Sequence, residues 1–289
     1  MSKYYKTKEN VVFDTIVNLV MIFTLLVCFL PFVYMAALSF SSSKAIINNQ
    51  VSFWPVGFNL DAYKQIFTYP NFFQAYGNTF FYTICGTAIA MLMTIMFAYP
   101  LSKDYLLGHK FFMKLVVISM FFAGGMIPNY ILMVSLGLRD TVASFILPGM
   151  ISTYYVILMR SFFLTLPREL EEAGEIDGLD KWGVFWRIAI PLSKPIIATM
   201  TLFYVVQYWN DWFDAFLYLD TTTKWPVAYY LRQLISSASG TSADAGDAMQ
   251  IASNIKSCAM VLTSAPIICI YPFIQKYFVQ GMMLGGVKG

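Results

Sequence analysis

Hydrophobic and polar residues follow one another along this chain in long blocks. Six apolar stretches are separated by short polar connections. A helix needs about 20 mainly apolar residues to cross a bilayer, because the hydrocarbon layer is about 30 Å thick and each helical residue rises about 1.5 Å. The pattern therefore predicts six membrane-spanning helices, over residues 13–40, 76–101, 111–134, 142–164, 195–218 and 251–278. Prolines and glycines are predicted to interrupt most of them, at Pro31, Gly86, Gly124 with Gly125, Pro128, Pro148, Pro266 and Pro272.

Composition makes the bilayer the relevant solvent. The 289 residues are 58% hydrophobic and 12% charged, whereas soluble domains carry about 25% charged residues. We therefore expect an all-α, polytopic membrane protein with a single transmembrane domain over residues 1–289, and an ordinary cytosolic enzyme is excluded. The formal charge of +3 is too small to indicate a nucleic-acid partner.

Few residues that bind metals or act in catalysis are present. The four cysteines lie in apolar stretches without the two-residue spacing of a metal or redox motif, so we interpret them as small core hydrophobes that form no disulfide. The single histidine, His109, lies in a short polar connection and is interpreted as a solvated loop residue. The sequence therefore predicts no catalytic residue, no metal site and no cofactor in this chain.

The distribution of positive charge predicts the orientation. Thirteen Lys and Arg residues fall on the side of the N-terminus, and six fall on the opposite side. Because cytoplasmic loops are enriched in Lys and Arg, both termini are predicted to be cytoplasmic. The extracellular loops then cover residues of about 41–75 and 219–250.

One long cytoplasmic loop, residues 166–194, is rich in acids and is predicted to form two short helices. Pro167 suits a first helical position, and the acids that follow complement the positive end of the helix dipole. Gly178 provides a left-handed stop, and Asp180 is a suitable cap for the second helix. That second helix is predicted to end before Pro191.

The first of these helices carries a face that requires a partner. Leu170, Ala173 and Ile176 recur at three-residue spacing, and small residues at 173 and 174 leave room for another backbone. A lipid-bound amphipathic hairpin is the alternative, and its support comes from the aromatic residues at 182, 185 and 186. Five acids in the first helix argue against it, because the cytoplasmic leaflet is anionic.

The same loop resembles the EAA loop of ABC importer permeases. Glu172-Ala173-Gly174, then Asp177-Gly178, then residues 188–191 follow that pattern, with Gly174 in place of the usual alanine. In that family the loop forms coupling helices that insert into an ATP-hydrolysing subunit. The resemblance implies that this contact involves Glu169, Glu172, Ala173, Gly174, Asp177, Gly178 and Pro191.

Similarity to one branch of this family extends over nearly the whole chain. Residues 53–63, 121–130 and 281–289 look like the oligosaccharide-uptake permeases of the LplC type. The resemblance implies the type I ABC importer permease fold in the bacterial cytoplasmic membrane. It also implies a second related permease, two ATP-binding subunits and an extracellular or periplasmic solute-binding protein as partners. This chain has no phosphate-binding loop, so ATP and Mg are expected to be used by separate chains.

The fifth predicted span contains a polar cluster in its outer half. Carboxylates facing lipid would be costly, so these groups are expected to face a cavity or a partner helix. Aromatic rings beside amide and carboxylate groups suit an oligosaccharide, although interfacial aromatics with helix–helix polar contacts remain an equal alternative. A helix break at Pro128 would add backbone carbonyls to the same cavity. The predicted substrate pathway comprises Asn129, Tyr130, Tyr208, Asn210, Asp211, Trp212 and Asp214.

Two other functional classes fit part of the pattern. A secondary transporter driven by an ion gradient would also have broken helices and midplane charges, but it would not need the acidic loop. A membrane enzyme could use Asp211 and Asp214, which lie three residues apart, yet no histidine or cysteine accompanies them. The expected function is therefore oligosaccharide import by alternating access, with the glycan itself left open.

Overall fold

The computed structural model describes residues 8–122, 124–240 and 254–270. Every regular element in these ranges is a helix, which confirms the predicted all-α class. The chain divides into two compact units, Met1–Tyr69 with Gln233–Ser264 and Pro70–Arg232 with Ala265–Gly289.

The first unit contains α1 (Lys8–Ser39), α2 (Ser43–Ile47) and α3 (Asp61–Thr68). Polar groups at the end of α1 hold it together. The Tyr63 hydroxyl donates to Ser39 Oγ at 2.9 Å, and the buried Cys258 thiol lies 3.4 Å from the Ser39 carbonyl. All four cysteines are free, as predicted, but Cys28 and Cys269 are exposed on apolar helices rather than buried in a core.

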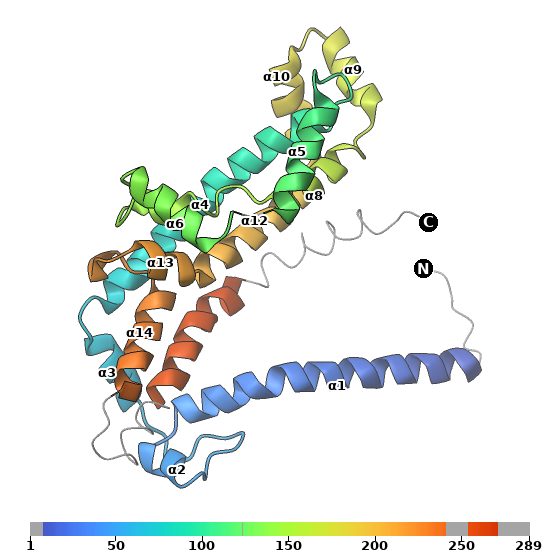
Figure 1. Cartoon of the computed structure of the whole chain (residues 1–289). Coiled ribbons are helices and arrows are strands. Elements are labelled where there is room, and N and C mark those ends of the chain that lie inside the picture. Colours follow the sequence, from blue (N-terminus) through green and yellow to red (C-terminus); the bar gives the residue numbers. More distant parts are fainter. Residues whose placement is uncertain (1–7, 123, 241–253, 271–289) are drawn as a thin grey trace. The chain divides into compact units, whose positions relative to one another are not determined.

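The second unit is built around α4 (Phe72–Leu101), a long unbroken helix that packs against both α8 and α12 (Figure 1). Its other helices are α5 (His109–Phe121), α6 (Met126–Ser135), α7 (Val142–Ile146), α8 (Thr153–Phe163), α9 (Arg168–Ile176), α10 (Lys181–Val184), α11 (Ile190–Leu192), α12 (Lys194–Asn210) and α13 (Phe213–Tyr218). A π-helical turn η1 (Phe185–Ala189), a 3-10 turn η2 (Thr222–Lys224) and the start of α14 (Val227–Gly240) complete it.

Close packing of α4 against α12 forms the core of this unit. The buried hydroxyls of Thr94 and Tyr204 lie 2.7 Å apart. A Cβ added at Gly86 would lie 2.8 Å from the ring of Tyr208, so the glycine allows the two helices to approach closely. At the far end of α4, Tyr99 packs edge-on against Phe163. Buried aromatic rings thus fix α4 between its neighbours.

Hydropathy located the apolar segments but not their breaks. Within the described ranges, α1 and α4 are long and apolar enough to cross a membrane, and two bent helix pairs also qualify if each is one span. These pairs are α5 with α6, bent by 111°, and Lys181–Leu192 with α12, bent by 78°. The count of six spans stays a prediction, because part of the sixth stretch lies outside the described residues.

Two predicted interruptions are confirmed. The third span breaks between α5 and α6 beside Gly124 and Gly125, so Pro128 lies inside the first turn of α6, and the prediction of a break there was wrong. The fourth span is split into α7 and α8 at residues 147–152. Pro148 follows α7 there, and Ser152 caps α8. The predictions at Pro31 and Gly86 were also wrong, because α1 and α4 continue through them.

Candidate functional site

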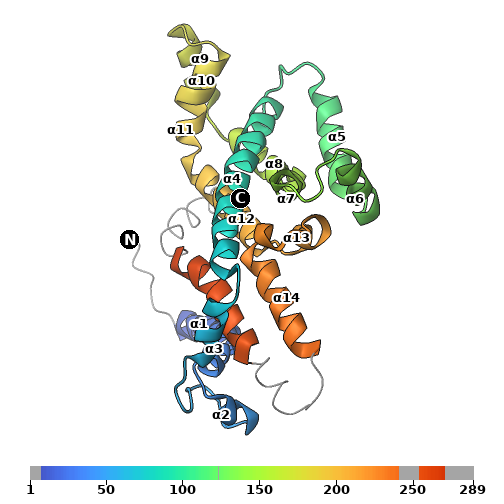
Figure 2. The same cartoon turned by 90° about the vertical axis from the view of Figure 1, so that its left-hand side faces the viewer.

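The acidic loop forms a helical hairpin, which we define as residues 167–192. Gly178 has a φ of +86°, the left-handed conformation predicted for the stop after α9. The Asp180 carboxylate accepts a hydrogen bond from the Gly183 N–H at 2.7 Å and caps α10 as predicted. Pro167 precedes α9 as its N-cap residue, one position earlier than predicted. Figure 2 shows the hairpin at one end of the second unit.

The second helix of the hairpin does not end before Pro191, and that prediction was wrong. α10 continues through the π-helical turn into α11, which contains Pro191. The Ile190 N–H donates to the Phe185 carbonyl, five residues back. A widened turn accommodates the proline ring, which would clash with the carbonyl four residues back in an α-helix.

Gly174 is buried inside the hairpin. A Cβ added at this position would lie 2.5 Å from Ile188 Cδ1 and 3.3 Å from Leu179 Cδ1. The close approach that Gly174 allows in this structure is therefore with the second helix of its own hairpin, and not with the partner backbone proposed from the sequence.

The opposite face of α9 is exposed. Leu170 and Ile176 are 44% and 86% exposed, and Ala173 between them is exposed as well. Glu172 is exposed beside this apolar strip. Glu169, Asp177 and Gly178 also lie at the hairpin surface. The structure thus brings the predicted coupling residues together on one element, with Gly174 directed inward and Pro191 in the last turn.

Among the residues that the structure describes, three ion pairs involve the hairpin, and sequence reasoning missed all of them. Lys103 Nζ lies 2.5 and 2.6 Å from the two carboxylate oxygens of Glu171, and both side chains are largely buried. Arg168 contacts Asp104 at 2.6 Å. Two of the three therefore attach α9 to residues 102–108, the connection between α4 and α5.

The third ion pair joins the two helices of the hairpin, between Lys181 and Glu175. Hydrogen bonding to Glu175 raises the pKa of Lys181, and hydrogen bonding to Arg168 lowers the pKa of Asp104. No local pattern reveals such contacts, because the partners of the first two lie 64 and 68 residues apart.

His109 lies near this cluster, and its interpretation as a solvated loop residue was wrong. It is the first residue of α5 and is half-buried, with Nε2 3.0 Å from the Leu101 carbonyl. Arg160 Nε donates to the same carbonyl at 2.6 Å. Both side chains therefore bind a carbonyl at the end of α4 that has no partner within the helix.

The predicted substrate pathway divides into buried and accessible residues. Tyr208 is 1% exposed and donates to the Ile146 carbonyl at 2.9 Å, so it acts as a packing residue in this structure. The ring of Trp212 lies 3.7 Å below the Arg232 guanidinium, which occupies one of the two faces that a sugar could stack on. Neither residue therefore presents the open aromatic surface expected from the sequence.

The accessible polar groups gather at the break between α12 and α13. Asp211 Oδ1 accepts hydrogen bonds from the N–H groups of Phe213 and Asp214, both at 3.1 Å, and so begins α13. Asn210 is exposed, with its amide donating to the Val206 carbonyl. Asp211 and Asp214 are half-buried.

Two candidates for the substrate pathway come from the third predicted span and lie in α6, close to α13. The ring of Tyr130 stacks on Tyr218 of α13, with centroids 6.2 Å apart. Asn129 is exposed. Tyr130 is therefore near the helix that carries Asp214, and its place in a common substrate pathway stays a prediction.

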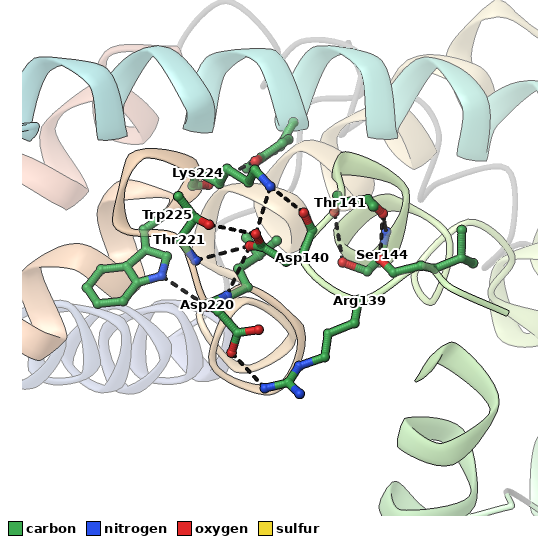
Figure 3. A network of polar contacts seen from close by, with 11 residues as sticks. Arg139, Asp140, Thr141, Ser144, Asp220, Thr221, Lys224 and Trp225 are labelled. Carbon is green, nitrogen blue, oxygen red and sulfur yellow. Dashed lines mark hydrogen bonds and ion pairs between the residues drawn. The ribbon is translucent and has the colours of Figure 1, made fainter. Parts of the chain in front are cut away.

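A second polar network connects the α6–α7 and α13–α14 loops and is drawn in Figure 3. Its centre is Asp140, which has a φ of +57°. The Asp140 carboxylate accepts hydrogen bonds from Lys224 Nζ at 2.8 Å and from the Thr221 hydroxyl at 2.6 Å. Arg139 pairs with Asp220 at 2.9 Å. Sequence reasoning missed this network, whose partners lie 81 and 84 residues apart.

Similarity to known proteins covers almost the whole chain, although no family model matches it. Protein LplC of Bacillus subtilis (strain 168) is 44% identical over 289 residues, which cover 99% of this chain and 98% of that protein. The polygalacturonan/rhamnogalacturonan transport system permease protein YtcP of the same organism is 38% identical, covering 97% and 100%.

A solved structure is also similar to this chain over almost its whole length. One chain of a bacterial ABC transporter involved in the import of the acidic polysaccharide alginate superposes with a TM-score of 0.84 at 29% identity. The superposition covers 96% of this chain and 100% of the other. The likeness therefore extends over nearly the whole chain.

Proposed function

Because this chain belongs to the permease subunits of binding-protein-dependent sugar ABC importers, we propose that it moves an oligosaccharide or polysaccharide fragment by alternating access. The energy comes from ATP that is hydrolysed with Mg in separate chains. The assembly contains a second related permease, two ATP-binding subunits and the sugar-delivering binding protein. Relatives that carry polygalacturonan, rhamnogalacturonan and alginate in their names support a polymeric or oligomeric substrate.

The observation that carries this proposal is the exposed face of α9. Leu170, Ala173 and Ile176 present apolar surface beside the Glu172 carboxylate, on a hairpin whose interior is already filled by Gly174 against Ile188. A packed hairpin with an exposed apolar strip is suited to enter a cleft on another protein as a rigid body. That cleft belongs to the ATP-binding subunit.

The charge distribution supports the orientation. Thirteen of the nineteen Lys and Arg residues lie on the hairpin side of the predicted topology. The hairpin and both termini are accordingly placed in the cytoplasm of a multi-pass protein. The Asp140 network and the Asp211–Asp214 break are placed on the opposite side, where substrate arrives from the binding protein.

The polar break after α12 is the proposed substrate contact. Asn210, Asp211 and Asp214 supply one amide and two carboxylates, which are suitable partners for sugar hydroxyls. Tyr130, half-buried near the end of α13, supplies an aromatic edge. Tyr208 and Trp212 position these groups through packing and do not bind the sugar themselves.

Glu172→Lys tests the docking role. Reversing this charge is expected to lower binding-protein-stimulated ATP hydrolysis and uptake in proteoliposomes by about fivefold or more, the lower end of a typical coupling free energy. Membrane insertion should be unaffected, because Glu172 is exposed and lies outside the packed hairpin interior.

Lys110→Glu provides the matched control. Lys110 is exposed in the first turn of α5, outside the hairpin, so its reversal should leave uptake at the wild-type level. Equal uptake by wild type and Glu172→Lys would remove α9 from the proposed interface.

A further inference from the structure

The Lys103–Glu171 ion pair differs from the other two ion pairs of the hairpin by its burial. The two side chains are only 12% and 15% exposed, whereas the Arg168–Asp104 pair is 73% and 68% exposed. Lys103 Nζ also lies 4.5 Å above the ring of Tyr99 in α4. Removing one member of a buried pair leaves an uncompensated charge, so this contact holds its two segments together far more firmly than an exposed pair.

Glu171 and Glu172 therefore have different tasks although they are neighbours. Successive residues of an α-helix point about 100° apart, so the two carboxylates leave α9 in different directions. Glu171 faces Lys103 and the end of α4, whereas Glu172 faces outward. The first fastens the hairpin to its own chain, and the second is available to another protein.

The opposite end of α4 is fastened to the loop between α13 and α14. Asn78 Nδ2 donates to the Thr223 carbonyl at 2.7 Å, and the Tyr82 hydroxyl donates to the Lys224 carbonyl at 2.8 Å. The Val227 N–H donates to the buried Thr79 hydroxyl at 2.7 Å. These contacts lie next to the Asp140 network of Figure 3, in which Lys224 takes part.

α4 itself is suited to carry displacement from one end to the other. Its 30 residues form one helix of about 45 Å without a break. The third, fourth and fifth predicted spans of the same unit are interrupted. α4 is therefore the one uninterrupted path among these segments between the hairpin and the α13–α14 loop.

We propose that α4 is a rigid rod that carries motion of the hairpin to the loop at residues 219–226, and that Lys103 is the positioning residue that joins the rod to the hairpin through Glu171. The proposal rests on the docking of the hairpin to an ATP-binding subunit. It adds a specific mechanical link within this chain. When the hairpin moves, the Lys103–Glu171 pair makes α9 and α4 move as one body.

Distance measurements in the complete transporter test this link. The four native cysteines are first replaced by serine or alanine. Spin labels are then attached at Phe97→Cys in α4 and at Arg187→Cys in the hairpin, because both positions are exposed. The expected distance distribution is narrow and is the same with and without ATP. A shift of the wild-type distance between nucleotide states would overturn the proposal, because the hairpin would then move relative to α4.

Lys103→Gln and the double variant Lys103→Gln with Glu171→Gln provide the functional readout. The double variant leaves no unpaired buried charge, so it separates loss of the link from misfolding. In both, we expect a broader distance distribution and a fall of about fivefold or more in sugar transported per ATP hydrolysed, with pull-down of the ATP-binding subunit retained. Lys103→Arg should keep the pair and restore transport per ATP.

Glu175→Gln is the matched control, because it breaks an exposed ion pair within the hairpin and leaves the link to α4 intact. It should transport like wild type. Wild-type transport per ATP in the double variant would refute the rod, while ATP-driven uptake by the wild type would still support the docking role. Absence of ATP-driven uptake in the wild type would instead refute the proposed function.

Discussion

Acidic residues that look alike in the sequence differ in what they contact. Glu171 is held by Lys103, Asp180 caps α10, and Asp211 begins α13. Asp140 organises a loop from a left-handed conformation that few residues other than glycine, asparagine and aspartate adopt. Each carboxylate is fixed by N–H, hydroxyl or ammonium donors that lie either two to three residues away or in a distant segment.

Asp140→Asn isolates the charge of Asp140 from its backbone conformation, since asparagine also tolerates a positive φ. Burial opposes ionisation of this carboxylate, but hydrogen bonds from Lys224 and Thr221 outweigh it and hold the pKa of Asp140 far below its usual range. At pH 7 the variant is expected to lower the melting temperature of the purified protein by about 2 to 5 °C.

The pH dependence of this difference has a definite sign. A carboxylate whose pKa is lowered by folding stabilises the protein above its unfolded pKa of about 3.9, and this stabilisation is lost as the pH falls through the folded value. The difference in melting temperature between wild type and Asp140→Asn should therefore be constant between about pH 5 and pH 7 and shrink below about pH 4. A difference that widens on acidification would contradict the role of the Asp140 charge.

Local signals were predictable from the sequence, and distant contacts were not. Gly178 and Asp180 act within a few residues, so their roles as stop and cap followed from residue type and spacing. Tyr208 was assigned to the substrate pathway because it lies beside Asn210 and Asp211. Its hydroxyl instead reaches Ile146, 62 residues away, and periodicity does not encode that contact.

The hairpin shows how one element accommodates a proline and a glycine. Pro191 fits because the preceding turn widens into a π-helix. Gly174 fits because its missing side chain admits Ile188. Both residues keep the two helices of the hairpin in contact, so the inner face of α9 packs against the second helix and the outer face is held in place.

Substitutions at Gly174 measure this support. Gly174→Ala gains up to about 1 kcal/mol of helix propensity, but its Cβ would meet Ile188 Cδ1 at 2.5 Å. Because that methyl is the flexible end of a side chain, the single variant is expected to be close to neutral. Ile188→Val removes the Cδ1 methyl, and the pair Gly174→Ala with Ile188→Val should then exceed Ile188→Val alone in melting temperature.

Gly174→Leu is the opposing case, because a large side chain has no space between α9 and the π-helical turn. It should lower the melting temperature and weaken pull-down of the ATP-binding subunit together. Full binding by Gly174→Leu would show that hairpin packing does not support the docking face.

At the scale of the whole molecule, hydropathy predicted the class and the positions of the apolar segments, because the bilayer imposes length and composition on every span. The division of the fourth segment into α7 and α8 was indicated by Pro148 and not by hydropathy, since apolar residues on both sides of the proline match a continuous span equally well. The ion pair at one end of α4 and the hydrogen bonds at the other join residues far apart in the chain, so only the folded structure reveals them.

The two fastened ends give the molecule its proposed mechanism. One end of α4 is joined to the hairpin that we propose to dock on the ATP-binding subunit, and the other is joined to the loops beside Asp140 and Lys224. In this proposal, ATP binding and hydrolysis move loops near the substrate entrance. A carrier driven by an ion gradient would have no use for the hairpin.

The most direct test is uptake of radiolabelled oligosaccharide into proteoliposomes that contain this chain, the second permease, the ATP-binding subunits and the binding protein. We expect uptake that requires enclosed ATP, stops when a non-hydrolysable analogue replaces it, and is unaffected by ionophores that collapse proton and sodium gradients. Uptake that continues without ATP, or that disappears with the ionophores alone, would contradict the account.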